Sequence, residues 1–230
     1  MSISYQNKLR EELSELKNPE RAAKMSAYMK ENFSFFGVKA PERQALLKGF
    51  IQEHGLPSKK EEYRVVLSLW EEPERELHYC ALEILEKRFK KRIEKEDSVL
   101  LEFLITNKSW WDTVDLIASK LAGAYFKKFP KQIESVAEKW INSNNLWLNR
   151  SAILYQLKYK QETDPYRLFS YCIQWSHSKE FFHQKAIGWA LREYSKTNPN
   201  QVVDFLKNHK VAPLSKREGL KWIRSKNIYP

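Results

Sequence analysis

Four stretches begin 35 residues apart and share one apolar register: CALEILEK (80–87), DLIASKLA (115–122), RSAILYQL (150–157) and KAIGWALR (185–192). They begin at Cys80, Asp115, Arg150 and Lys185, and their third positions form an apolar column of Leu82, Ile117, Ala152 and Ile187. A fixed period of this size indicates stacked helical repeats, in which each helix pair buries its apolar face against its neighbours. We therefore expect Asp115, Arg150 and Lys185 to project from parallel helices toward one surface.

The rest of the chain has the pattern of helices and short loops. No segment alternates apolar and polar residues over a convincing length, so we assign no strands. Apolar periodicity predicts helices over 4–17, 20–34, 42–54, 58–71, 74–91, 96–106, 109–127, 130–142, 146–161, 165–176, 179–196, 199–208 and 213–225. No linker rich in Ser, Gly or Pro interrupts them. We therefore expect an all-α helical-repeat solenoid, an α-α superhelix, forming a single domain over residues 1–230.

The charge balance points to a polyanionic partner. The 230 residues include 40 Lys+Arg against 29 Asp+Glu, a formal net charge of +11. Such an excess suits a polyanion if the cations gather on one face, as in a basic concave cleft. The basic run at 87–92 fits either a solvated helix end or a specific nucleic-acid patch, and we favour the solvated helix end.

Cysteine usage and hydropathy indicate the compartment. Cys80 and Cys172, with no paired spacing, argue against a disulfide framework and a zinc site. The histidines lack metal-ligand spacing, so we expect no metal and no cofactor. Residues 1–16 are charged and amphipathic, and no stretch approaches the roughly 20 apolar residues of a membrane span. We expect a cytoplasmic monomer without a membrane partner.

The 35-residue register places two tryptophans beside the charged positions. Trp111 lies one turn before Asp115, and Trp189 lies one turn after Lys185. Indole faces beside a carboxylate suit a cationic, planar or sugar-like group, although both tryptophans fit an ordinary core equally well. Arg150 can grip a phosphate bidentately, or it can form an internal ion pair with Asp115. For Lys185 we favour a phosphate contact over a Schiff base, because nothing nearby in sequence indicates the necessary desolvation.

Such a set of residues suits the cleavage of an N-glycosidic bond. Departure of the base leaves an oxocarbenium-like sugar, whose positive charge a carboxylate can stabilise. A base that is already alkylated and cationic leaves as a neutral species and needs no general acid. One carboxylate, Asp115, then suffices to stabilise the sugar cation and to orient the attacking water.

Longer motifs carry a resemblance to a known family. They are KSWWDTVD (108–115), WLNRSAILYQLKYKQ (147–161), SKEFFHQKAIGWALREYSKTNP (178–199) and APLSKREGLK (212–221), with AAKMSAYMKENF (22–33) upstream. In order and over nearly the whole chain, they closely resemble AlkD, the bacterial alkylpurine DNA glycosylase family built of HEAT-like repeats. The resemblance implies excision of positively charged N3- and N7-alkylated purines from duplex DNA, leaving an abasic site for base excision repair. It also implies that the damaged base is not drawn into a deep pocket.

The resemblance further implies roles for single residues. Asp115 corresponds to the catalytic acid that stabilises the sugar cation and aligns water. Trp111 and Trp189 correspond to the aromatic pair that encloses the deoxyribose. Arg150 corresponds to a clamp on the DNA backbone phosphate, and Tyr28 to a further residue of the DNA cleft.

The loop at 37–44 departs from the family pattern. Ala40 and Gln44 stand where the pattern carries a hydroxyl residue and a second arginine that help to hold DNA. We therefore expect Lys39 and Arg43 to take over DNA contacts there.

Two alternatives stay open. One is a non-catalytic helical-repeat scaffold that binds nucleic acid or protein through the same concave face. The other is a related subgroup that keeps the fold with an occluded cleft and no measurable excision. The intact set of residues around Asp115 argues against that subgroup.

Overall fold

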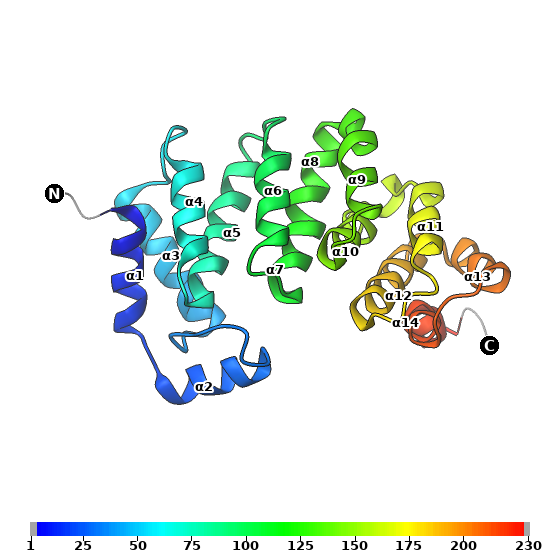
Figure 1. Ribbon diagram of the computed structural model, residues 1–230, viewed down its shortest axis with the longest axis horizontal. Helices are drawn as coiled ribbons and strands as arrows, with labels where there is room; N and C mark the ends of the chain where they lie inside the picture. The colour runs from blue at the N-terminus through cyan, green and yellow to red at the C-terminus, as the bar shows by residue number, and fades with distance from the viewer. Residues whose placement is uncertain (1–3, 228–230) are drawn as a thin grey trace. The chain divides into compact units, whose positions relative to one another are not determined.

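The computed structural model describes residues 4–227, which form helices joined by short loops (Figure 1). Within this range there is no strand, and an isolated parallel bridge joins Ser34 and Glu74. The prediction of an all-α helical-repeat fold is confirmed. The chain divides into two compact units, of which the first ends at Arg92 and the second begins at Ile93. A single domain over 1–230 and a basic concave cleft stay predictions.

The described residues of unit 1 form five helices with a core between them. Its helices are α1 (Tyr5–Glu15), α2 (Pro19–Tyr28), α3 (Ala40–His54), α4 (Glu62–Glu71) and α5 (Arg75–Phe89). α4 packs against α5, and α1 packs against α3 and α4. Phe50, Leu69 and Leu82 are among the residues that this packing buries.

Unit 2 carries the remaining repeats. Its helices are α6 (Asp97–Thr106), α7 (Trp111–Leu116), α8 (Gly123–Lys128), α9 (Glu138–Ile141), α10 (Leu146–Leu154), α11 (Pro165–Gln174), α12 (Phe181–Ser195), α13 (Pro199–Asn208) and α14 (Pro213–Ser225). A π-helical segment at Ile117–Ala122 joins α7 to α8, and a second one at Ile133–Ala137 leads into α9. Among residues 4–227, every helix is too short or too polar to span a lipid bilayer.

All thirteen predicted helical segments are present, and three of them differ from the prediction by more than two residues at one end. α2 ends at Tyr28 because Lys30 and Glu31 both adopt a φ of 59°, which no right-handed helix can accommodate. α4 begins four residues later than expected, after a turn at 58–61. α10 ends at Leu154, and the chain turns before a short 3₁₀ segment at Lys160–Glu162.

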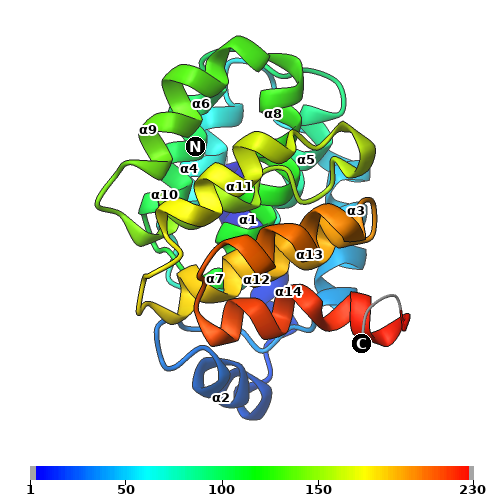
Figure 2. The same cartoon turned by 90° about the vertical axis from the view of Figure 1, so that its right-hand side faces the viewer.

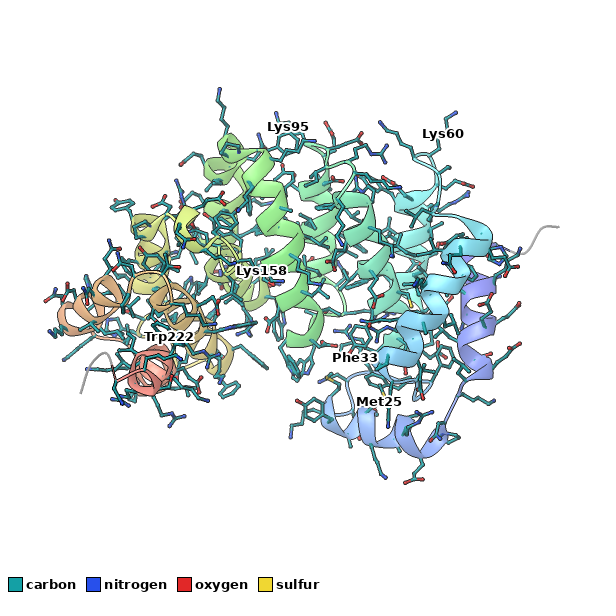
Figure 3. The ribbon with its side chains drawn as sticks, turned by 180° about the vertical axis from the view of Figure 1, so that it is seen from behind. Met25, Phe33, Lys60, Lys95, Lys158 and Trp222 are labelled. Atoms are coloured by element: carbon teal, nitrogen blue, oxygen red, sulfur yellow. The ribbon has the colours of Figure 1, made fainter. Side chains whose placement is uncertain are left out.

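The apolar column predicted from the 35-residue period is buried. Leu82, Ile117 and Ile187 are fully inaccessible and Ala152 nearly so, each within the core of its own unit. Among the other tryptophans, Trp70 and Trp140 are buried, whereas Trp222 is half-buried on α14 (Figure 3). Both cysteines are buried and free.

In unit 1, a buried carboxylate fixes the loop before α3. Glu76 of α5 accepts hydrogen bonds from the backbone N–H groups of Phe36, Gly37 and Val38, at 3.1, 2.9 and 3.1 Å. Burial raises the pKa of Glu76, and these hydrogen bonds oppose the rise. Gly37 has a φ of 87°, and a Cβ there would lie 2.2 Å from the Asn18 carbonyl oxygen. The loop geometry therefore requires glycine at this position.

In unit 2, α12 and α14 lie side by side (Figure 2). The contact depends on Gly188, because a Cβ there would lie 2.6 Å from Glu218 Cβ and 3.1 Å from the Ser215 carbonyl oxygen. The Ser215 hydroxyl donates to the Gln184 carbonyl oxygen of α12 at 2.9 Å. Gly188 thus serves the approach of a neighbouring helix.

We predict opposite effects for the same substitution at two helical glycines. Gly188→Ala forces α12 away from α14 and should lower the free energy of unfolding by about 1–3 kcal/mol. Gly49→Ala, on α3 with nothing within 4 Å of the new Cβ, should raise it by about 0.5–1 kcal/mol, since alanine favours the helix. Urea denaturation of both variants measures the difference. A stable Gly188→Ala protein would contradict the close packing.

Candidate active site

Asp115 and Arg150 form a bidentate ion pair between consecutive repeats. Arg150 Nε donates to Asp115 Oδ1 at 2.7 Å, and Nη2 donates to Oδ2 at 2.8 Å. The third hydrogen bond of the guanidinium, from Nη1, goes to the Phe182 carbonyl oxygen at 2.7 Å. The Arg150 and Asp115 side chains are 5% and 15% exposed. The internal ion pair considered for Arg150 is therefore present, and it joins α7, α10 and the start of α12.

Local structure sets the positions of both partners. Asp115 lies at the end of α7, directly before the π-helical segment Ile117–Ala122, and its carbonyl oxygen accepts from the Ser119 hydroxyl at 2.7 Å. A π-helical turn inside a helix often marks a functional site, because it re-aims the side chains around it. Arg150 lies on α10, whose start is capped by Asn145 through the N–H groups of Trp147 and Leu148.

Burial and charge act in opposite directions on the carboxyl group. Burial raises the pKa of Asp115, and the hydrogen bonds and charge of Arg150 partly offset that rise. The bidentate geometry is that of an ionised carboxylate. Each carboxylate oxygen can accept two hydrogen bonds, and Arg150 occupies one site on each. Asp115 therefore keeps acceptor capacity for a water molecule or for a developing positive charge.

Lys185 pairs with a carboxylate that the repeat did not predict. Its Nζ lies 3.2 Å from Glu218 Oε1, and Arg192 Nη1 donates to Glu218 Oε2 at 2.8 Å. Burial raises the pKa of Glu218, but hydrogen bonding to Lys185 and the nearby cations outweigh it, so the pKa lies below its usual value. The structure thus joins Asp115 to Arg150 and gives Lys185 a separate partner on α14.

Aromatic side chains lie on the helices that carry the ion pair, and the Arg150 guanidinium lies 5.8 Å from the Phe182 ring centroid. Trp111 and Trp189, the two predicted from sequence, are half-buried on α7 and α12. Trp110, Trp147 and Phe182 form a cluster with ring centroids 4.9–5.8 Å apart. Sequence reasoning singled out neither Trp147 nor Phe182. The signal was available, because these two positions are themselves 35 residues apart.

The buried side chain of His183 contacts Asn149, the residue before Arg150. His183 Nε2 lies 3.3 Å from Asn149 Oδ1, and its Nδ1 lies 2.8 Å from the Ser178 hydroxyl. The Asn149 amide donates to backbone carbonyls including that of Trp140, at 2.9 Å, so its oxygen faces the ring. Burial, with the charge of Arg150, lowers the pKa of His183 to about 4. His183 is therefore a neutral ring that holds α10 against α12.

Comparison with known proteins assigns the family. Residues 9–223 match the model of the DNA alkylation repair enzyme family. The chain belongs to this family. It is 37% identical to a predicted DNA alkylation repair enzyme from Enterococcus faecalis, whose structure superposes with a TM-score of 0.84 over 90% of this chain and 96% of that chain.

Two more distant structures share the fold. The Streptococcus mutans UA159 protein smu.31 is 14% identical, with a TM-score of 0.63 over 95% of this chain and 99% of that chain. AlkD2 from Streptococcus mutans is 17% identical, with a TM-score of 0.59 over 87% of this chain and 96% of that chain. No curated protein matches the chain.

The remaining predicted site residues of this family member lie in unit 1. Tyr28 ends α2 and is 68% exposed. Lys39 is exposed at the N-cap of α3. Arg43 is 7% exposed, donates to Glu83 Oε1 at 2.8 Å and lies over the Tyr79 ring. Arg43 therefore packs α3 against α5, and a DNA contact for any of the three residues stays a prediction.

The described chain offers no evident metal centre beside these residues. Among residues 4–227, no group of three or more His, Cys, Asp or Glu side chains is arranged to hold a metal ion. The chemistry available at the ion pair is that of a carboxylate and a guanidinium, with the Phe182 ring centroid 5.8 Å from the guanidinium.

We predict that Arg150→Lys lowers the free energy of unfolding by about 2–4 kcal/mol, since an ammonium replaces only part of three charge-assisted hydrogen bonds. Arg192→Lys is the matched control. Its side chain is 27% exposed and shares Glu218 with Lys185, so the loss should stay below about 1 kcal/mol. Chemical denaturation distinguishes the two, and equal losses would contradict the buried pair.

We also predict an acid-sensitive contribution from His183. Because its pKa is about 4 when folded and 6.5 ordinarily, the unfolded chain binds the proton first as the pH falls. The free energy of unfolding should drop by up to about 3 kcal/mol between those values. His183→Gln should remove this part of the pH dependence, whereas His177→Gln, at an exposed position, should keep it. Denaturation at pH 7 and pH 4.5 measures both.

Proposed function

We propose that this protein is a monofunctional DNA glycosylase that hydrolyses the N-glycosidic bond of positively charged N3- and N7-alkylated purines in duplex DNA. The observation that carries the proposal is the Asp115 carboxylate, partly buried and locked by two hydrogen bonds to Arg150. Membership of the DNA alkylation repair enzyme family supports the substrate class. An abasic site would remain for base excision repair.

The reaction follows from the charge on the damaged base. When the C1′–N bond breaks, its electron pair moves to the base, which leaves as a neutral molecule. The sugar becomes an oxocarbenium-like cation, and Asp115 stabilises it electrostatically. Water then adds to C1′, and Asp115 orients it and accepts its proton. The step needs a carboxylate and water, and it uses no cofactor.

Arg150 would act first as a positioning residue. Its bidentate contact fixes the plane of the Asp115 carboxylate, and its contact to the Phe182 carbonyl oxygen anchors the guanidinium to α12. Orientation of this kind matters because a group held in place needs little reorganisation during the reaction. Its charge also favours the ionised carboxylate against the effect of burial.

The tryptophans would enclose the deoxyribose. Trp111 and Trp189 are half-buried, so part of each ring stays accessible to a ligand. An indole face attracts a cation, and the sugar gains positive charge only as the bond breaks. The enclosure would therefore favour the transition state over the bound substrate.

Cations and an exposed tyrosine would hold the duplex. We assign DNA contacts to Tyr28, Lys39, Arg43, Arg150 and Lys185, consistent with the net charge of +11. Lys185 and Lys39 are the more accessible of the four cations. We expect the protein to act as a monomer on DNA in the cytoplasm, at the nucleoid.

Asp115→Asn tests the proposal. Loss of the negative charge should reduce the release of 7-methylguanine from methylated duplex about 100- to 1000-fold, as removal of a transition-state stabiliser does. Asp112→Asn, the neighbouring carboxylate on α7, should stay within about threefold of the wild type. Single-turnover base release measures both.

Binding separates a chemical defect from a folding defect. Asp115→Asn should bind a duplex with an abasic analogue at least as tightly as the wild type, because the substitution removes a charge that repels DNA. If the variant releases base at the wild-type rate, the role of Asp115 is wrong. If the wild-type protein binds the duplex but releases no base, the chain is a non-catalytic scaffold.

A further inference from the structure

An aromatic cluster joins the same three helices that the ion pair joins. Trp110 lies directly before α7, Trp147 is the second residue of α10, and Phe182 is the second residue of α12. Their ring centroids lie 4.9–5.8 Å apart. The polar contacts run between the same helices, because Asp115 lies on α7, Arg150 on α10 and the Phe182 carbonyl oxygen on α12. The start of α12 is therefore held both by rings and by a hydrogen bond.

Trp147 and Arg150 make two kinds of contact with one residue of α12. They are three residues apart on α10, so they lie on one face of that helix. The Trp147 ring centroid lies 4.9 Å from that of Phe182, and Arg150 Nη1 donates to the Phe182 carbonyl oxygen at 2.7 Å. A carbonyl group in a helix points along the helix axis, so this oxygen stays in place only if the start of α12 keeps its position against α10. The Trp147 ring provides a contact that fixes this position.

Trp110 completes the cluster from the side of α7. Its Nε1 is buried and has no hydrogen-bond partner among residues 4–227, so ring contacts set the position of this indole. An unpaired buried N–H is unfavourable, and the packing against Trp147 and Phe182 offsets that cost. The Trp110 carbonyl oxygen accepts from the backbone N–H of Val114 at 3.0 Å, which begins the helix that carries Asp115. The cluster thus also fixes the start of α7.

The hydrogen bond to Phe182 matters because the Arg150 guanidinium is nearly inaccessible. The Arg150 side chain is 5% exposed, so water cannot readily replace a lost acceptor. If the start of α12 shifted, Nη1 would lack its partner, which is unfavourable for a buried donor. The guanidinium is planar and rigid, so turning toward another acceptor would move Nε and Nη2 away from Asp115. Loss of the Phe182 contact would therefore weaken the bidentate pair.

We propose that Trp147 is a positioning residue for the candidate active site: its contact with Phe182 holds the carbonyl oxygen that keeps Arg150 bidentate to Asp115. Trp147 acts through these residues and takes no part in the bond cleavage itself. Its effect on Arg150 is a property of the fold alone, whereas its effect on base release rests on the proposed function.

Three variants test the proposal. Trp147→Leu removes the ring and keeps an apolar side chain at the start of α10. Trp147→Phe keeps an aromatic ring and should restore most of the contact with Phe182. Trp222→Leu is the matched control, because it makes the same substitution at another half-buried tryptophan of unit 2, on α14 and outside the aromatic cluster. Urea denaturation of each variant gives the change in global stability.

Hydrogen exchange at the Arg150 Nε–H, followed by NMR, is the first measurement. This N–H donates to Asp115 Oδ1 at 2.7 Å, so its exchange reports opening of the pair without any base release. We expect Trp147→Leu to accelerate the exchange at least about tenfold beyond what its change in global stability explains. Trp147→Phe and Trp222→Leu should stay within about threefold of the wild type after the same correction.

The pH dependence of single-turnover 7-methylguanine release is the second measurement. Arg150 opposes the rise that burial causes in the pKa of Asp115, so a weaker pair raises this pKa. The acid limb of the rate profile should therefore move to higher pH in Trp147→Leu. At pH 7 the rate should fall about 10- to 100-fold, while binding to a duplex with an abasic analogue stays within about threefold. Trp222→Leu should keep the wild-type profile.

The two measurements separate the positioning role from the proposed function. Faster exchange at Arg150 in Trp147→Leu, together with a wild-type protein that releases no base, would support the positioning role and contradict the glycosylase. The positioning role is overturned if exchange at Arg150 in Trp147→Leu changes only as its global stability does, or only as much as in Trp222→Leu. A loss confined to DNA binding, with the acid limb unmoved, would also overturn it.

Discussion

The bidentate ion pair between Asp115 and Arg150 is the constraint on which the candidate site depends. A buried ion pair is weak evidence for stability, because the desolvation of both charges offsets much of their attraction. Its consequence here is geometric: with the Phe182 carbonyl oxygen, it fixes α7, α10 and the first turn of α12 to one another. The pair holds a carboxylate at a set orientation on α7, which an apolar contact of equal stability would not do.

The 35-residue period predicted that Asp115 and Arg150 lie close together, with the ion pair as one of two roles considered for Arg150, because stacking converts a sequence interval into a spatial one. Equivalent positions of neighbouring repeats lie side by side, so Asp115 meets Arg150, and the apolar column at Ile117 and Ala152 is buried beneath them. The same rule fails at the last repeat. The position 35 residues after Lys185 is the buried Leu220, and the actual partner, Glu218, lies two residues earlier.

Side-chain direction is the part that sequence could not provide. Arg43 was predicted to contact DNA, which stays a prediction, and the sequence did not show that it also lies against Tyr79 and pairs with Glu83, because α3 presents that position to α5. Arg88 and Arg92 had the pattern of a solvated helix end and instead turn toward Glu62. In each case the charge pattern was clear, but the face that the helix buries depends on its neighbour. Local periodicity cannot predict that a cation lies near a carboxylate of another helix.

Arg150 shows how the two roles considered from sequence are compatible. A guanidinium has five N–H donors, and three are used by Asp115 and Phe182. One N–H remains on each terminal nitrogen, and each can donate to a phosphate oxygen. A DNA phosphate would therefore extend the existing network at its free edge and leave Asp115 paired. Its negative charge would add to that of Asp115 around a sugar that becomes positive, so the same contact that holds the backbone would also favour bond cleavage.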